Sequence, residues 1–233
     1  MDTTTPALVT DEIDVLQQMV PLAGAAVAEL GCGKAELARR LLDRGLVAQV
    51  HAFEVDERQH AANLASAHPP ALHFHAGGAE DVPLPDASCD GVLMLKSLHH
   101  VPMPLLDRAL GEIRRILRPG GWLYVSEPVY AGEFNDMVKL FHDEGEVRAA
   151  AYAALKRAAA AGVLQWQEER VFSTALAFRD FDDFVEKMVK VTHSDLALGE
   201  GVIDEVRRRF ERRMTPTGAR FVRDMRVNLL RRP

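Results

Sequence analysis

Short apolar runs alternate with amphipathic segments along residues 25–127. Five runs have the length and composition of buried strands: Ala25–Leu30, Val47–Val55, Ala71–Ala76, Gly91–Leu95 and Trp122–Ser126. The segments between them carry apolar residues at helical spacing and predict three helices: Ala35–Leu42, Glu57–Ala67 and Leu105–Leu117. Regular alternation of strand and helix predicts βαβ units, and therefore a parallel sheet with helices on both faces.

This alternation ends after Glu127. Residues 134–161 predict one or two helices, the second of them Ala-rich over Arg148–Ala161. The remaining elements that we expect are a helix over 11–20 with Thr10 as its N-cap, a strand over 171–177, helices over 181–191 and 202–214, and a last strand over 226–230. The chain shows neither a repeat nor a linker. We therefore expect a single domain over 1–233, with a helical insertion at 130–166.

The chain composition is that of a folded protein, with 48% hydrophobic and 27% charged residues. Apolar runs never approach the length of about 18 residues that a transmembrane helix needs. The first residues lack the basic and apolar segments of a secretory signal. Two cysteines cannot build a disulfide framework. We therefore expect a cytoplasmic protein that makes no use of a membrane.

The net charge of −6 is unevenly distributed. Residues 204–233 hold ten arginines against four acidic residues, which leaves the rest of the chain strongly acidic. A basic segment can bind nucleic acid or another anionic partner. Only two aromatic residues, Phe210 and Phe221, accompany these arginines, so a solvated helix face and strand ends are favoured over a nucleic-acid partner.

The first strand leads into a turn with two glycines, Gly31 and Gly33, which let the backbone approach a ligand closely. A dinucleotide fingerprint requires a third glycine where this chain has Glu36, so NAD and FAD are disfavoured. Asp56 ends the second strand, where an acidic residue accepts ribose hydroxyls, although it also suits an N-cap. Glu29 suits a ligand ammonium and would repel a pyrophosphate. A ribose and an ammonium without phosphate point to S-adenosylmethionine.

Residues 27–127 resemble the core of class I S-adenosylmethionine-dependent methyltransferases, in the branch that acts on small molecules. The motifs that carry the resemblance are Val27–Gly33, Phe53–Asp56, Gly78–Asp86, Cys89–Met94 with Leu98–Val101, and Arg118–Gly121. They stand in the family's order and spacing over about 100 of the 233 residues. The resemblance implies a Rossmann-like doubly wound α/β fold. Its mostly parallel sheet has seven strands, helices on both faces and an antiparallel last strand.

The resemblance also implies roles for individual residues. Gly31, Cys32 and Gly33 would hold the methionine portion of the cofactor, and Glu29 its ammonium group. Asp56 would bind the ribose hydroxyls. The residues beside the adenine would be Val55, Glu57, Ala79 and Glu80, and those beside the sulfonium Leu95 and Lys96.

Three positions depart from the family's pattern. Ala35 replaces the third glycine of the cofactor turn, and Gly78 replaces an aspartate of the adenine turn. Lys96 stands where the family has a small or neutral residue, and its charge would repel a sulfonium. A degenerate site in a non-catalytic binding module is therefore one alternative.

Methyl transfer from a sulfonium mainly requires an acceptor held in line, with a general base only where the acceptor loses a proton. The candidate catalytic residues are His99, His100 and Tyr130, which follow the fourth and fifth strands. A structural role for the two histidines is the alternative. His73 and His75 share a face of one strand, but two ligands do not predict a metal site, and none is expected.

The predicted function is therefore transfer of a methyl group from S-adenosylmethionine to a small-molecule acceptor, with S-adenosylhomocysteine as product. The insertion at 130–166 is expected to cover the substrate mouth. One alternative is a methyltransferase for RNA or protein that docks through 207–232. The sequence identifies neither the acceptor nor the oligomeric state.

Overall fold

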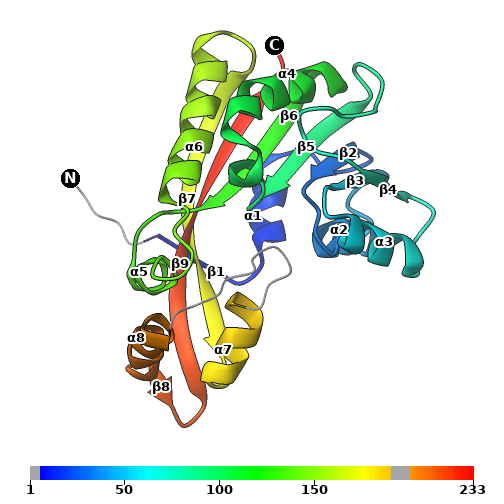
Figure 1. Ribbon diagram of the computed structural model, residues 1–233. Coiled ribbons are helices and arrows are strands. Elements are labelled where there is room, and N and C mark those ends of the chain that lie inside the picture. The colour runs from blue at the N-terminus through cyan, green and yellow to red at the C-terminus, as the bar shows by residue number, and fades with distance from the viewer. Residues whose placement is uncertain (1–5, 190–199) are drawn as a thin grey trace. The chain divides into compact units, whose positions relative to one another are not determined.

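The computed structural model describes residues 6–189 and 200–233 (Figure 1). The chain divides into two compact units. The larger unit comprises 11–127, 147–170 and 226–233, and the smaller unit comprises 1–10, 128–146 and 171–225. The predicted insertion at 130–166 is therefore shared between them, with 130–146 in the smaller unit and 147–166 in the larger. Its role as a cover for the substrate mouth stays a prediction.

The described strands form one sheet in the order β1-β7-β9-β6-β5-β2-β3-β4, and β8 pairs with β9. The seven strands from β7 to β4 are the predicted seven-stranded sheet of the α/β fold. Two of them, β7 (Gln165–Phe178) and β9 (Gly218–Arg231), continue into the smaller unit. There β1 (Leu8–Val9) and β8 (Met214–Thr215) extend the sheet beyond the predicted strands.

Five parallel strands make the centre of the larger unit: β2 (Ala26–Leu30), β3 (Gln49–Glu54), β4 (Leu72–Ala76), β5 (Cys89–Leu95) and β6 (Leu117–Pro128). The last strand, β9, is antiparallel, and Gly120 and Gly121 of β6 exchange backbone hydrogen bonds with Arg232 just beyond it. This confirms the predicted mostly parallel sheet. It follows from the continuous apolar runs, which suit strands covered on both faces.

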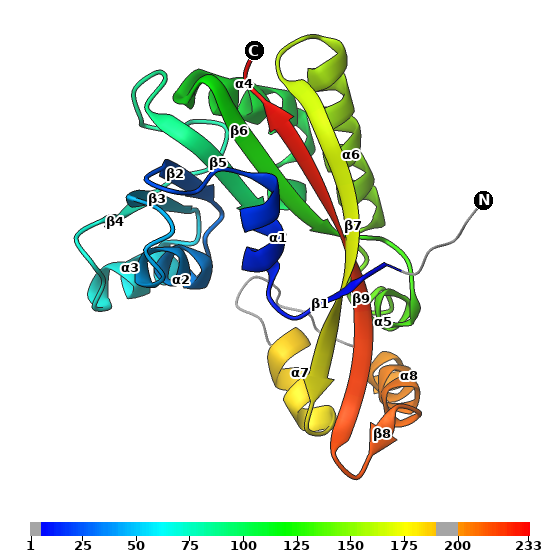
Figure 2. The same cartoon turned by 180° about the vertical axis from the view of Figure 1, so that it is seen from behind.

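The helices of the larger unit are α1 (Glu12–Met19), α2 (Glu36–Asp43), α3 (Glu57–Ala65), α4 (Leu106–Ile116) and α6 (Gly145–Ala160). Figures 1 and 2 show α4 and α6 on one face of the sheet and α1 on the other. Leu110 and Ile113 of α4 and Leu155 of α6 are buried in one aliphatic core with Val92 and Leu123 of the strands. Apolar residues at positions 106, 110 and 113 repeat at helical spacing, which explains why α4 was predictable.

The smaller unit contains α5 (Glu133–Val138), α7 (Phe181–Met188) and α8 (Glu200–Glu211) beside its strands. Its core is aromatic rather than aliphatic. The phenylalanines in this core are Phe134, Phe141, Phe178, Phe181, Phe184, Phe210 and Phe221. Phe184 is fully buried, and its ring lies 5.3 Å from the rings of both Phe178 and Phe210.

The structure corrects several predicted boundaries. The N-cap of α1 is Asp11 and not Thr10, because the Asp11 carboxylate accepts the Ile13 N–H at 3.1 Å. Two strands begin earlier than predicted, β7 at Gln165 and β9 at Gly218. Exposed and partly buried residues alternate over the first half of β7. Several of them are charged, so this part of the strand lacks the apolar run from which a strand was predicted. The predicted helix over 181–191 ends at Met188, and residues 190–199 lie outside the described part of the chain.

The residues Arg118–Gly121, predicted as a turn, belong to the start of β6. The ladder shifts register there, since Cys89 pairs with Leu117 and Gly91 pairs with Trp122. Within the part of the chain that the structure describes, no helix combines the length and the apolar character that crossing a membrane requires.

Candidate cofactor cavity and neighbouring histidines

The turn between β2 and α2 takes three residues through left-handed backbone conformations. Gly31 has a φ of 78° and Gly33 a φ of 54°. A Cβ atom on Gly31 would lie 2.6 Å from the Cβ of Ser97, so this position has room for glycine alone. Ala35, which replaces the usual third glycine, also has a φ of 54°. An alanine there costs about 1 kcal/mol of backbone strain, which this chain tolerates.

Backbone hydrogen bonds tie this turn to the end of β3. The Gly31 and Cys32 N–H groups both donate to the carbonyl oxygen of Phe53, at 3.0 and 2.8 Å. The Gly33 N–H donates to Oε2 of Glu54 at 2.8 Å, and Oε1 of Glu54 accepts the Asp56 N–H at 2.9 Å. Glu54 is buried and was not among the predicted site residues. Its signal in the sequence was its place in the motif Phe53–Asp56, two residues before Asp56.

Asp56 is the N-cap of α3, as one of its two interpretations predicted. Its Oδ1 accepts the N–H groups of Arg58 and Gln59, at 2.9 and 3.3 Å. Val55 beside it is 68% exposed, which is unusual for a large apolar side chain, and Glu57 is exposed as well. The end of β3 therefore presents an apolar side chain next to a carboxylate. Binding of ribose and adenine at these residues stays a prediction.

Glu29 is the only acidic residue in β2, and it is 5% exposed. Its Oε2 is buried and makes no hydrogen bond among the described residues. Burial raises the pKa of Glu29 to about 8, although the Ala38 N–H and the charge of Lys96 act in the opposite direction. A buried carboxyl group with an unsatisfied oxygen and a raised pKa is unfavourable for stability, so a ligand that pairs with it has much to gain.

Glu29 lines a cavity of about 330 Å³ in the larger unit. The other predicted cofactor residues in its wall are Gly31, Cys32, Leu95 and Lys96. Lys96 has a φ of 56°, and its backbone N–H donates to the Ser126 carbonyl oxygen at 2.7 Å. Five of the predicted cofactor residues, from the ends of β2 and β5 and the turns that follow them, therefore meet around one cavity.

Gly78 departs from the family's pattern, and the structure explains how. A Cβ atom on Gly78 would lie 2.3 Å from Oε2 of Glu80 and 2.7 Å from Oε1. The Glu80 carboxylate thus lies where the side chain of an aspartate at position 78 would begin. Ala79 between them is buried. The acidic group expected in this turn is present, but it comes from a residue two positions later.

His99 is buried in the loop after β5, and Glu127 at the end of β6 holds it. Nδ1 of His99 contacts Oε2 of Glu127, while Oε1 of Glu127 accepts the Leu98 and His99 N–H groups at 2.9 and 3.3 Å. Glu127 is 4% exposed and was not predicted. Because a carboxylate accepts the Nδ1 proton, Nε2 carries the lone pair of the neutral ring.

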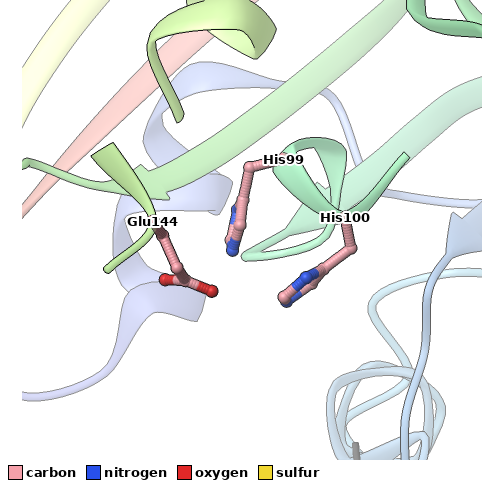
Figure 3. A group of neighbouring side chains, drawn as sticks. All are labelled: His99, His100 and Glu144. Atoms are coloured by element: carbon pink, nitrogen blue, oxygen red, sulfur yellow. The ribbon is translucent and has the colours of Figure 1, made fainter. Parts of the chain in front are cut away.

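His100 is exposed, and its ring lies 4.0 Å from that of His99 at an angle of 43° (Figure 3). Tyr130 and Glu144, the latter labelled in Figure 3, belong to the smaller unit. The Tyr130 hydroxyl donates to Oδ1 of Asp143 at 2.8 Å, and Nε2 of His142 lies 2.9 Å from Oε1 of Glu144. The predicted catalytic residues therefore divide between the units, with His99 and His100 in the larger.

Residues 28–125 run from β2 into β6. They match the family model described as a methyltransferase domain. The 27-O-demethylrifamycin SV methyltransferase of Amycolatopsis mediterranei is 35% identical over 121 residues, which are 49% of this chain and 43% of that enzyme. The chain thus spans less than half the length of the curated relatives it matches.

Two solved structures have the same fold over nearly the whole chain. A protein from Bacillus halodurans superposes with a TM-score of 0.64 and 17% identity, covering 96% of this chain and 99% of that protein. An S-adenosylmethionine-dependent methyltransferase from Mesorhizobium loti superposes with a TM-score of 0.54 and 15% identity, covering 95% and 97%. At such identities the likeness shows the fold alone.

Proposed function

We propose, from the premise that residues 28–125 form a class I methyltransferase domain, that this protein methylates a small molecule with S-adenosylmethionine as donor. The observation that carries the proposal is Glu29, a buried acid in the wall of a cavity of about 330 Å³, whose Oε2 has no hydrogen-bond partner among the residues that the structure describes. An ammonium group is the natural complement of that oxygen. S-adenosylmethionine, when bound, supplies an ammonium for this contact and an activated methyl group on its sulfonium.

Residues in the wall of the cavity, together with Val55 and Asp56 after β3, which are not part of that wall, suit the remaining parts of this cofactor. The glycines of the first turn allow close approach of the backbone, and Asp56 offers a carboxylate at the end of the next strand. The exposed side chain of Val55 is an apolar surface for a flat base. The positive charge of Lys96 favours the ionised form of Glu29 from a distance. An ammonium group bound at Glu29 would stabilise the same ionised form by direct contact.

For acceptors that lose a proton, we assign the role of general base to His99. Glu127 fixes the Nδ1 proton, so Nε2 of His99 would receive the proton that the acceptor hydroxyl releases. Glu127 is then a positioning residue, since it acts through the ring that it orients. His100, against the His99 ring, and Tyr130 remain candidates for contacts with the acceptor.

A small-molecule acceptor is favoured over RNA or protein by the state of the arginines in 204–213. Arg208 and Arg209 pair with Glu205, and Arg213 pairs with Glu133. These contacts reduce the positive charge that a nucleic acid would meet. The related rifamycin enzyme, by its name, also acts on a small molecule. A cytoplasmic location is part of the proposal, and two cysteines without a disulfide suit a reducing compartment.

Calorimetric titration with S-adenosylmethionine and S-adenosylhomocysteine tests the cofactor assignment, with NAD as the control ligand. We expect binding of both cofactor forms, no binding of NAD, and weaker binding to Asp56→Ala. A panel of hydroxylated small molecules and total RNA, each with methyl-labelled cofactor, then tests the acceptor class. A folded protein that binds neither cofactor form would overturn the proposal and favour a non-catalytic module.

A further inference from the structure

Three histidines that are distant in sequence lie together on one face of the sheet edge. In the parallel ladder between β3 and β4, His51 pairs with His73, and Phe53 pairs with His75. Side chains two residues apart on a strand share a face, so all three imidazoles project to the same side. The pair His73 and His75 alone did not predict a metal site. The strand register adds His51 to it.

The imidazole nitrogens of this cluster already stand at chelating distance. Nδ1 of His51 lies 3.0 Å from Nε2 of His75. Two nitrogens bound to one tetrahedral zinc ion at about 2.0–2.1 Å are about 3.3 Å apart, so the two rings need to separate slightly and to turn until both lone pairs face the ion. The His73 ring is stacked on that of His51, with centroids 5.0 Å apart, and is exposed.

In the 3.0 Å contact, one ring nitrogen donates its proton to the other. Metal binding therefore requires the donor ring to change tautomer, so that its proton moves to the other nitrogen of that ring.

The packing holds the chelating pair in place. The His75 ring stacks on the buried Phe53 ring, with centroids 4.6 Å apart and planes at 14°. His51 is part of the central ladder, where its backbone pairs with Ala28 on one side and His73 on the other. Both chelating rings therefore arise from strands rather than loops, which favours a defined geometry over a chance surface contact.

We propose that His51, His75 and His73 form a binding site for a divalent transition-metal ion, with Zn²⁺ as its typical occupant. His51 provides Nδ1 and His75 provides Nε2, while His73 turns from its stacked position to become the third ligand. Water completes a four-coordinate shell. The site is separate from the cofactor cavity, because none of these residues is among those that line it.

Zinc titration of the protein, with any affinity tag removed, tests the proposal by calorimetry. The key variant is His75→Phe, which keeps an aromatic ring on Phe53 and removes the ligand nitrogen. We expect it to weaken Zn²⁺ binding by more than about tenfold, since even outer-shell partners of metal sites are worth about 10–100-fold. His51→Ala should act similarly, and His73→Ala should have a smaller effect.

His68→Ala is the matched control, since His68 contacts Phe74 and the Ser66 carbonyl oxygen and is not part of the cluster. It should bind zinc like the unchanged protein. A cooperative thermal unfolding transition of every variant, compared with that of the unchanged protein, reports that the larger unit is folded. Absence of zinc binding, or equal binding by His75→Phe and His68→Ala, would overturn the proposal. In that case the 3.0 Å contact is only a hydrogen bond between neutral rings.

Discussion

Asp183 of the smaller unit and Glu29 of the larger unit are both buried acids, and their hydrogen bonding differs. In the smaller unit, Asp183 is 7% exposed and receives hydrogen bonds from Arg179 and from Lys187, the latter at 2.8 Å. These partners hold the pKa of Asp183 below its usual value. In the larger unit, Glu29 is 5% exposed, its Oε2 has no hydrogen-bond partner in the described chain, and its pKa is raised. A paired buried acid serves the fold, whereas an unsatisfied one requires another explanation.

The hydrophobic cores of the two units also differ in composition. The smaller unit packs aromatic rings around Phe184. The larger unit has an aliphatic core, and its buried acids lie at the carboxyl ends of strands, with Glu54 as the last residue of β3 and Glu127 near the end of β6. In parallel α/β sheets this edge is where ligands bind. We infer that the larger unit gives up some stability for binding, while the smaller unit is built for packing.

The largest effect, a loss of kcat, is expected on changing Glu127, and it shows whether this residue contributes to catalysis or to stability. Glu127→Gln keeps an oxygen for the two backbone N–H groups but donates to Nδ1 of His99, which moves the ring proton to Nε2. We expect kcat to fall by about 10²–10⁴-fold, the usual worth of a general base, with unchanged cofactor affinity. The assay is transfer of a labelled methyl group to an acceptor found in the panel above. An unchanged kcat would assign Glu127 to the fold, as for Asp183.

The smaller unit should respond in stability alone. Phe184→Ala removes a ring from the centre of the aromatic core and should lower the free energy of unfolding by about 3–5 kcal/mol. Chemical denaturation measures this loss. Titration with S-adenosylhomocysteine at a temperature where the variant is folded should give the affinity of the unchanged protein. A large loss of affinity there would mean that the division of labour between the units is wrong.

Replacing the two contrasted acids by amides should give opposite results. Glu29→Gln should weaken S-adenosylhomocysteine binding by roughly 10–100-fold, because a charge-assisted hydrogen bond is worth about 1.5–3 kcal/mol. It should leave the free energy of unfolding unchanged or raised, since Oε2 of the buried acid has no hydrogen-bond partner within the described chain. Asp183→Asn should lower the unfolding free energy and leave binding unchanged. Thermal unfolding and calorimetry on both variants decide this, and equal behaviour of the two would remove the contrast.

The smallest effect is expected where the Glu80 carboxylate lies in the place of a side chain at Gly78. Glu80→Gln should weaken cofactor binding several-fold, in line with about 0.5–1.5 kcal/mol for one hydrogen bond. Adding Gly78→Asp to that variant should restore affinity, because the new carboxylate would begin where the Glu80 carboxylate now lies. Failure of the double variant to bind better than Glu80→Gln would show that the two positions are not equivalent.

The elements from β2 to β6 were predictable because each strand and helix has its own apolar period within a few residues of sequence. The same holds for the turn at Gly31, whose need for glycine is local. Glu54, Glu127 and His51 were not predictable as partners, since each meets a group more than twenty residues away through strand register or a loop contact. Only a folded backbone brings such pairs together.

The early part of β9 was missed for a different reason. Over Gly218–Met225 buried residues are interspersed with exposed or partly buried ones, two of them arginines, and the strand pairs with β8 in a hairpin of the smaller unit. Its charged residues suggested a solvated face without indicating a strand. The cap of α1 was misplaced by one residue because Thr10 and Asp11 are both good N-caps, and only the hydrogen bond to Ile13 distinguishes them.

The central claim is that Glu29 is kept as a buried acid in order to meet a cationic ligand. With a pKa of about 8 before binding, Glu29 is mostly protonated at pH 7. A ligand ammonium favours the ionised form and lowers this pKa, so binding must release a proton below pH 8. The affinity should then fall by up to about tenfold for each pH unit between pH 8 and pH 6.

The most direct measurement is therefore calorimetric titration of S-adenosylhomocysteine at pH 7 in two buffers of different ionisation enthalpy. We predict release of close to one proton on binding by the unchanged protein, and none by Glu29→Gln. Binding without proton release in the unchanged protein, or the same release in both proteins, would contradict the role assigned to Glu29.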